Sequence, residues 1–189
     1  MELTQALIDE HVLILEGLGY LKLARDRIEK NQHPPVAFFK NAVPFFRNYA
    51  DKYHHYKEEF LMFGFLAAKK EGLLDLEIGS LRHQHESGRG FLTRVDTSLK
   101  GYDAGNEIAV TSLLENLAAF CSVLSRHIFM EDRVFFPMVE KELSPTEKNT
   151  LLEQFRLEEQ ALETRNPVEK NLELLNEMQR LIGGTYNDD

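Results

Sequence analysis

Apolar residues recur at spacings of three and four along most of this chain, which is the pattern of amphipathic helices. Four long segments carry the pattern, at residues 4–31, 35–71, 75–100 and 107–142. Pro34 and Pro35 end the first segment, because residues that precede proline resist helical dihedrals, and Gly72 is a natural stop for the second. Residues 101–106 predict a turn before the fourth segment. We therefore predict an all-α protein in which four helices form an up-down-up-down bundle.

The region after residue 143 predicts two further, shorter helices. Residues 144–147 combine an N-cap serine, a proline at the first helical position and a glutamate three residues after the cap, and Asn166–Glu169 repeats this arrangement. The last helix should end at Gly183–Gly184. The faces of both helices are rich in leucine and glutamate, without paired ligand-type residues. The predicted organisation is a bundle at 1–143 and an extension at 144–189 that packs on it and offers a possible surface for a protein partner or a homodimer.

Two positions inside the long segments predict local irregularity. Pro44 removes a backbone donor and crowds the preceding turn, so a kink or a short break is expected there. Gly88 lies one turn after His85 on the same helix face. A glycine at this position leaves room for a close helix approach or for a small ligand, and the plain alternative is a local bend.

Composition narrows the class of protein. The chain has 189 residues, of which 43% are hydrophobic, and this suits one domain with a sizeable core. The formal net charge of −9 argues against a nucleic-acid or anionic membrane surface, because both require clustered lysine and arginine. Cys121 is the single cysteine, so no intrachain disulfide is possible, and a packed thiol in a reducing compartment is expected. No leader sequence or membrane-length apolar stretch is evident, and a cytoplasmic location is therefore expected.

Ligand-type side chains occupy positions where this pattern predicts core residues. Each of the first and third segments contributes one inward histidine, and each of the second and fourth contributes a histidine followed four residues later by a glutamate. These residues are His11, His54, Glu58, His85, His127 and Glu131. A single core histidine is usually hydrogen-bonded to a backbone carbonyl, but six such groups in two matching halves indicate a shared site.

The offsets between the halves support a duplicated arrangement. His11 precedes His54 by 43 positions, and His85 precedes His127 by 42. Burying each polar group without a partner costs on the order of a few kcal/mol, so something must satisfy them, and a pair of metal ions does so most simply. Imidazole and carboxylate ligands without thiolate suit iron, manganese or zinc. Two glutamates on facing helices can each bridge two ions, which favours a dinuclear centre over a single zinc.

The remaining histidines have weaker claims to a role. His55 and Glu59 are turned about 100° away from the inward face in an α-helix, so they are expected around the centre or at the surface. His33 falls in a loop and His83 projects away from the His85 face, so both are expected to be solvated.

These motifs resemble those of the hemerythrin-like, or HHE cation-binding, domains over about residues 3–141. The resemblance depends on four stretches: Asp9-Glu10-His11, His54-His55-Tyr56-Lys57-Glu58-Glu59, His85-Glu86-Ser87-Gly88-Arg89 and His127-Ile128-Phe129-Met130-Glu131-Asp132 running into Phe136-Pro137. It implies a four-helix bundle around a non-haem di-iron centre with an oxo or hydroxo bridge. The six inward residues fall on the ligand positions of that family.

One departure from the family bears on function. Oxygen-carrying hemerythrins have a second histidine one turn before the third-helix ligand, where this chain has Leu81, and an aspartate at the position of Asp132, although Glu131 fits the internal repeat better. The resemblance is therefore greater to members tied to iron sensing, nitric oxide or peroxide handling, or repair of iron centres.

Three functions follow as hypotheses. The first is binding of iron and a small ligand (dioxygen, nitric oxide or peroxide) for sensing, storage or detoxification. The second is a di-iron redox enzyme that reduces nitric oxide or peroxide or repairs iron centres. The third is a metal-free helical interaction or phosphotransfer module, because His54-His55-Tyr56-Lys57 loosely matches His-x-x-Lys.

Overall fold

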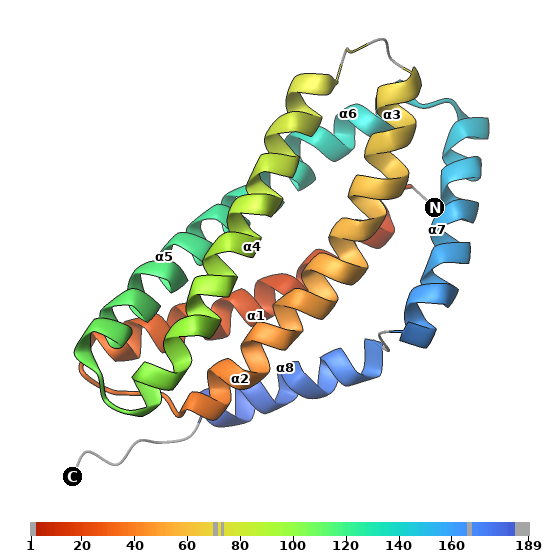
Figure 1. The fold of residues 1–189 in the computed structure, drawn as a ribbon. Helices are drawn as coiled ribbons and strands as arrows, with labels where there is room; N and C mark the ends of the chain where they lie inside the picture. Colours follow the sequence, from red (N-terminus) through yellow and green to blue (C-terminus); the bar gives the residue numbers. More distant parts are fainter. Residues whose placement is uncertain (1–2, 70–71, 73, 166–167, 184–189) are drawn as a thin grey trace.

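The computed structural model describes residues 3–69, 72, 74–165 and 168–183, and over these residues the chain forms six helices. The first is α1 (Gln5–Glu29). The second runs unbroken over residues 36–69 and comprises α2 (Val36–Phe45), η1 (Phe46–His55), η2 (Lys57–Met62) and α3 (Phe63–Lys69). The third is α4 (Asp75–Asp103), and the fourth, over residues 107–142, comprises α5 (Glu107–Met130), η3 (Glu131–Phe135) and α6 (Phe136–Glu142). Figure 1 shows these four helices in up-down-up-down order, which confirms the predicted fold class.

The ends of the helices follow the predicted signals with one exception. Gly72 takes a positive φ of 86°, as a stop after the second helix requires, whereas the predicted end at Glu71 lies outside the described residues. The predicted turn at residues 101–106 begins too early, because α4 continues through Gly101 to Asp103. A Cβ added to Gly101 would lie 2.5 Å from the Cβ of Ala109. This glycine therefore permits a close approach of α4 and α5, and Gly105 (φ 71°) makes the turn.

Pro44 neither ends nor interrupts the second helix. The helix widens into π-helical turns two residues later, and η1 and η2 together extend across the region that carries His54 and Glu58. A third π-helical stretch, η3, begins at Glu131 in the fourth helix. Such turns are rare and occur frequently at functional sites. Here they include His54, Glu58 and Glu131, which are three of the four residues of the two His-x-x-x-Glu motifs.

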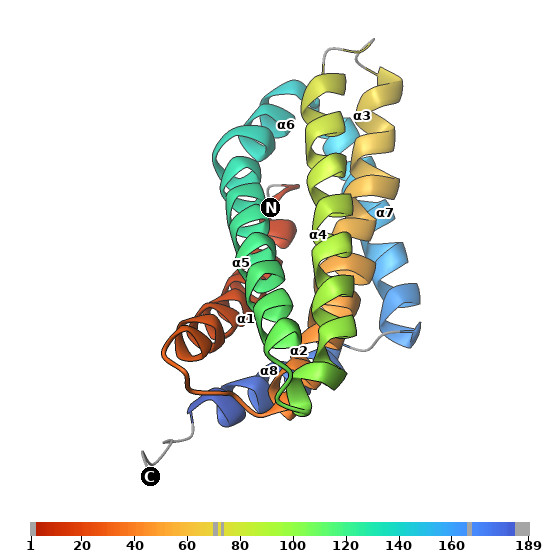
Figure 2. The same ribbon diagram turned by 60° about the vertical axis from the view of Figure 1, so that its left-hand side comes forward.

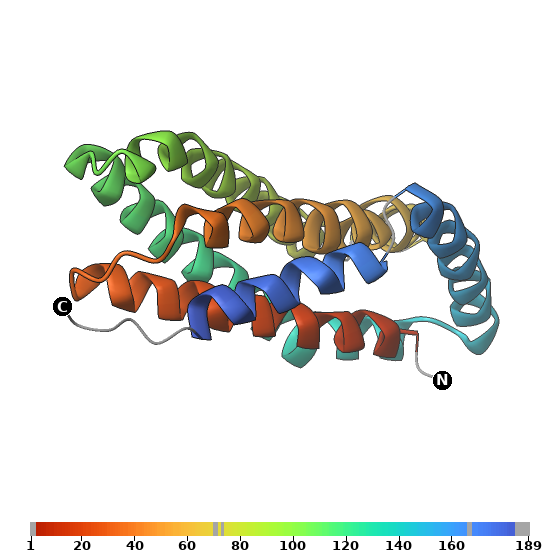
Figure 3. The same ribbon diagram turned by 90° about the horizontal axis from the view of Figure 1, so that it is seen from below.

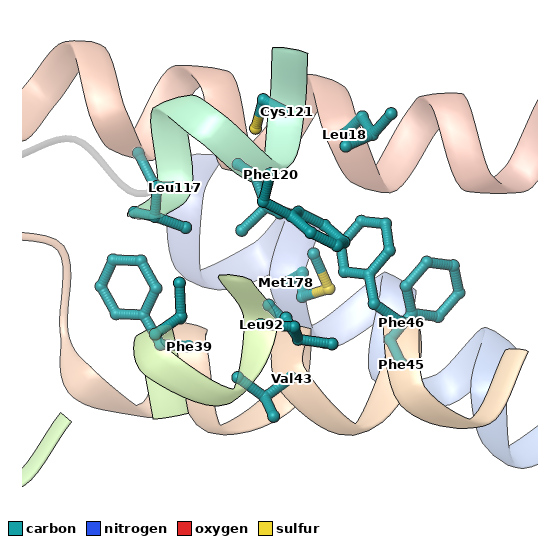
Figure 4. Packing of buried hydrophobic residues seen from close by; sticks show 14 of the residues in the cluster. Leu18, Phe39, Val43, Phe45, Phe46, Leu92, Leu117, Phe120, Cys121 and Met178 are labelled. Atoms are coloured by element: carbon teal, nitrogen blue, oxygen red, sulfur yellow. The ribbon is translucent and has the colours of Figure 1, made fainter. Parts of the chain in front are cut away.

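The hydrophobic core is divided into two clusters. The larger one joins α1, α2, η1, α4, α5 and α8, and Figure 4 shows its centre, where Phe46 meets Phe120 edge to face at a centroid distance of 5.1 Å. The smaller one lies at the other end of the bundle and includes Leu7, Met62 and Phe135. The buried histidines and glutamates lie in the sequence between the members of the two clusters on each helix, so they form a polar layer between two apolar regions.

The two C-terminal helices pack on different parts of the bundle. Helix α8 (Val168–Gly183) lies between α1 and α2, as Figure 3 shows, and buries Leu175, Met178 and Ile182 in the larger cluster. Helix α7 (Pro145–Arg165) lies beside α3 in Figures 1 and 2, and its Leu151 and Phe155 join the smaller cluster.

The start of α7 has the predicted capping arrangement. Glu147 Oε2 accepts a hydrogen bond from Ser144 N at 2.8 Å. The predicted cap at Asn166–Pro167 and the end at Gly184 lie outside the described residues.

The helix at residues 107–142 is long and apolar enough to cross a membrane by length and composition alone. Leu113, Leu117 and Cys121 on this helix are buried in the larger apolar cluster, and 28% of its most apolar stretch is buried in the bundle.

Candidate metal centre

All six predicted ligand residues are buried and meet in the polar layer between the two apolar clusters. Each is at most 2% exposed: His11 on α1, His54 on η1, Glu58 on η2, His85 on α4, His127 on α5 and Glu131 on η3. His33 and His83 are exposed, as the pattern predicts. The structure thus brings together the residues that the sequence pattern selected.

The four histidines form two facing pairs. The Nε2 atoms of His11 and His54 are 2.9 Å apart, and those of His85 and His127 are 3.0 Å apart. Two imidazole nitrogens that bind one ion at about 2.1 Å and at right angles to each other are separated by about 3 Å. Each pair therefore has the spacing of two ligands to one cation.

The two carboxylates connect the histidine pairs. Glu58 Oε1 lies 3.5 Å from His54 Nε2, and its Oε2 lies 3.4 Å from His85 Nε2. Glu131 Oε2 lies 3.4 Å from His11 Nε2 and 2.9 Å from His127 Nε2. None of the four carboxylate oxygens is in a hydrogen bond. Buried carboxylates are rarely left in this state, and two bridging positions between two cations would satisfy them.

The outer ring nitrogens of the four histidines are held by side chains around the centre. His11 Nδ1 donates to Asp132 (2.8 Å), and His54 Nδ1 donates to Glu10 (2.9 Å). His85 Nδ1 donates to Glu59 (2.6 Å), and His127 Nδ1 donates to Gln84 (3.2 Å). These bonds leave every Nε2 directed inward as a potential ligand, which is the usual arrangement of metal-binding histidines.

Sequence reasoning did not identify Glu10 and Gln84 as partners, although a signal was present. Glu10 directly precedes His11, and Gln84 directly precedes His85, just as Glu59 and Asp132 directly follow the two glutamates. Each partner therefore sits beside a ligand in the chain but supports a histidine on another helix. Asp132 takes this supporting position and does not replace Glu131 at the centre.

The close packing of charges shifts the pKa values of the site. Burial alone would lower the pKa of His54, but the Glu58 carboxylate and the hydrogen bond to Glu10 outweigh it and raise the pKa to about 10. Burial is likewise outweighed at His85, where the nearby Glu58 carboxylate and the hydrogen bond to Glu59 raise the pKa to about 9. The pKa of the Glu58 carboxyl moves the opposite way, well below its usual value, because the attraction of the His54 and His85 imidazoles overcomes burial. Without cations, Glu58 therefore stays ionised, and its negative charge is balanced by protonated histidines.

Metal binding is therefore expected to release protons. The raised pKa values of His54 and His85 favour protonated imidazoles at pH 7 in the metal-free protein, and the pKa of His11 is also raised by Asp132 and Glu131. Metal ions must displace these protons to bind, so about two or more protons should be released per chain. Calorimetric titrations with zinc at pH 7 in buffers of different ionisation enthalpy measure this number. A proton release near zero would contradict the assigned protonation.

The stability of the metal-free protein should fall in alkaline solution. The raised pKa values of His54 and His85 stabilise the fold fully below pH 6.5, the ordinary histidine value, and this contribution is lost as the pH rises through about 9 and 10. Urea unfolding of the metal-free protein between pH 6 and pH 10 should show this loss. The metal-loaded protein should instead lose metal and stability in acid, where protons compete for the ligands.

Of the two places expected for His55, around the centre or at the surface, the structure shows the first, because this residue is buried and only 7% exposed. Its ring stacks on that of His85 at a centroid distance of 3.8 Å. The expected turn of about 100° away from His54 holds for an α-helix, whereas the wider π-helical winding of η1 brings consecutive residues closer in angle. Burial and the repulsion from His85 lower the pKa of His55 to about 3, so this imidazole is neutral.

A cavity of about 300 Å³ opens beside one of the two histidine pairs. His85 and His127 line it, whereas His11 and His54 do not. Its walls include His55 and Gly88 and the apolar side chains of Phe46, Ala50, Leu92, Phe120, Val123 and Leu124. Helix α4 continues without a break through Gly88, so the structure favours space for a small ligand over a local bend at this glycine.

A buried lysine connects the centre to α7. Lys57 is fully buried, and its Nζ donates to Glu10, which holds His54, and to Glu159 on α7 at 2.9 Å. The corresponding residues of the second half are Met130 in place of Lys57 and Gln84 in place of Glu10. The two halves of the site therefore differ in charge outside the ligands.

Lys57→Met should destabilise the protein by about 3 kcal/mol, because removing one partner of a buried ion pair leaves the other uncompensated. The double variant Lys57→Met with Glu10→Gln reproduces the side chains of the second half and should regain most of this loss. Urea unfolding of both variants measures the difference. A double variant no more stable than the single one would contradict the pairing.

Comparisons with known proteins agree with this description. The Hemerythrin HHE cation binding domain family matches residues 2–139. An uncharacterized protein of Mycobacterium bovis and two counterparts from Mycobacterium tuberculosis strains are each 26% identical over 153 residues. These matches cover 81% of this chain but 59% of each relative, so the chain spans less than two thirds of the length of these relatives. No solved structure matches it significantly.

The chain is thus a member of the hemerythrin HHE cation-binding domain family. Its buried histidine and glutamate clusters fit a metal site.

Proposed function

We propose that this protein binds two iron ions in the polar layer and a small ligand, such as dioxygen, nitric oxide or peroxide, in the adjoining cavity. The observation that carries the proposal is that Glu58 and Glu131 are fully buried without hydrogen bonds and lie between two histidine pairs. Manganese or zinc would suit the same ligand set, and iron is preferred because the family resemblance implies it. The binding serves sensing, storage or detoxification in the cytoplasm.

The residues of this chain would divide the task between holding the metals and admitting the ligand. His11 and His54 would hold one ion, His85 and His127 the other, and Glu58 with Glu131 would join them. Iron bound here would supply open coordination positions and a change of oxidation state. The cavity joins apolar side chains to the charged residues Arg47, Asp51, Lys52 and Arg89, so it could admit small apolar molecules or small anions.

Enzymatic turnover of nitric oxide or peroxide, or repair of iron centres, remains the second candidate, and the same cavity supports it by giving a substrate a route to one side of the centre.

The phosphotransfer hypothesis finds little support, since His54, His55 and Lys57 are all buried and a phosphorylated histidine must be accessible.

Metal analysis and the visible spectrum of the pure protein test the proposal. After anaerobic loading with ferrous iron and exposure to air, about two irons per chain and a near-ultraviolet charge-transfer absorption that changes on addition of azide are expected. Absence of bound iron would overturn the proposal. Steady-state consumption of peroxide or nitric oxide would place the protein with the enzymes instead.

The C-terminal helices retain the proposed role of a partner surface. Phe60 is 66% exposed and Leu157 on α7 is 55% exposed, and both line a shallow pocket at the junction of α7 with the bundle. Size-exclusion chromatography with light scattering of the wild type and of Leu157→Glu would test for a homodimer.

A further inference from the structure

We infer that His55 is a third imidazole ligand of the metal held by His85 and His127, so that the two metal positions are chemically different. The inference depends on the proposed function and adds a residue outside the six ligands of the sequence pattern. Ligand atoms of His55, Glu58, His85 and His127 all lie within 4.8 Å of one another. A second group with the same compactness contains His11, His54, Glu58 and Glu131. Glu58 belongs to both groups, as a bridging carboxylate would.

His55 is the buried histidine with no hydrogen bond at either ring nitrogen. Its Nδ1 has one longer contact, with Asp51 Oδ1 at 3.5 Å, and its Nε2 has no polar contact of this kind. The other four buried histidines each have an Nδ1 partner and an Nε2 that faces the centre. A buried imidazole without a partner carries an uncompensated desolvation cost, and a cation beside it would remove that cost.

The second half of the bundle offers no equivalent residue. The position directly after His127 is Ile128, which is buried in the larger apolar cluster. The first histidine pair therefore has no third imidazole in its compact group, whereas the second pair has one. The internal repeat thus gives two similar positions that differ by one neutral ligand.

This difference falls on the side of the centre that faces the cavity. His55, His85 and His127 all line the cavity, and its remaining walls combine apolar side chains with charged ones such as Arg47 and Arg89. The three-imidazole position is therefore the one beside the cavity, whereas His11 and His54 do not line it.

Mössbauer spectra of protein loaded with iron-57 test the inference. The wild type should give two quadrupole doublets of equal area, since the two irons have different ligands. In His55→Ile, which places isoleucine at both equivalent positions, the two quadrupole splittings should become more alike, and the affinity for the second metal should fall at least about tenfold in a competition titration with zinc. His83→Ile is the matched control, because His83 is exposed on the same bundle, and should leave both measurements unchanged.

Several outcomes would overturn the inference. A single doublet from wild-type protein with two irons would do so without any variant. Unchanged spectra and zinc affinity in folded His55→Ile would also overturn it. If only the affinity for azide changed, His55 would contact the small ligand and not the metal, which contradicts the inference. Wild-type protein that binds no iron would contradict the proposed function as well, whereas the other outcomes contradict only the inference about His55. The two failures are therefore distinguishable.

Discussion

Replacing His54 or Glu131 with alanine is expected to remove metal from the protein. His54 is one of the two imidazoles of its pair, and Glu131 lies within 3.4 Å of one histidine from each pair, so either change removes a ligand that no neighbour can replace. Iron content of purified, reconstituted variants, measured by inductively coupled plasma mass spectrometry, should fall well below that of the wild type. The visible absorption of the centre should fall in proportion.

The matched controls are His33→Ala and His83→Ala. Both histidines are exposed and lie outside the polar layer, so both variants should keep the iron content of the wild type. Equal retention of iron in all four variants would refute the assignment of the centre. Circular dichroism of each variant distinguishes loss of metal from loss of fold.

Gly88→Leu is expected to block the small ligand while leaving the metals in place. A Cβ at this position would lie 3.8 Å from Phe120 Cε2, which is ordinary contact, so the backbone accepts a side chain and the rest of the leucine must enter the cavity. Replacing a helical glycine with leucine also favours α4, by up to about 1 kcal/mol. The affinity for azide should drop at least about tenfold, and the iron content should not change.

Gly79→Leu separates the two effects of that substitution. Gly79 lies on the same helix, and no atom lies within 4 Å of an added Cβ, so this variant gains the helix propensity without filling the cavity. It should bind azide like the wild type. Equal azide affinity in Gly88→Leu would show that the ligand reaches the metals by another route.

Helical periodicity was sufficient to predict the bundle and the convergence of six side chains, for a physical reason. Inward positions of a helix are fixed by its period, so a histidine that shares a face with Leu7 and Ile14 must enter the core wherever the helix packs. The fourth helix spans the predicted residues 107–142, and its start is fixed by Asn106, whose side chain accepts a hydrogen bond from Ala109 N and so caps it.

Other features could not be obtained from a pattern that assumes regular α-helices. The burial of His55 follows from π-helical winding, which has no simple sequence signal. The ion pairs of Lys57 join helices η2, α1 and α7, and the relative placement of α7 is a tertiary property. The cavity depends on side chains from three helices and on the absence of one at Gly88. The partners Glu10 and Gln84 were visible as neighbours of ligands, but their targets on facing helices were not.

The polar layer between two apolar clusters also affects how the molecule comes apart. Without cations, the middle of the bundle holds buried carboxylates and imidazoles, whereas the two ends hold packed apolar side chains. Local unfolding of the metal-free protein should therefore begin in the polar layer. Amides of η1, η2 and η3 should exchange with deuterium sooner than those of the flanking α-helical turns. Bound metal would then hold the two apolar clusters together, and its loss would let the two ends of the bundle move relative to each other.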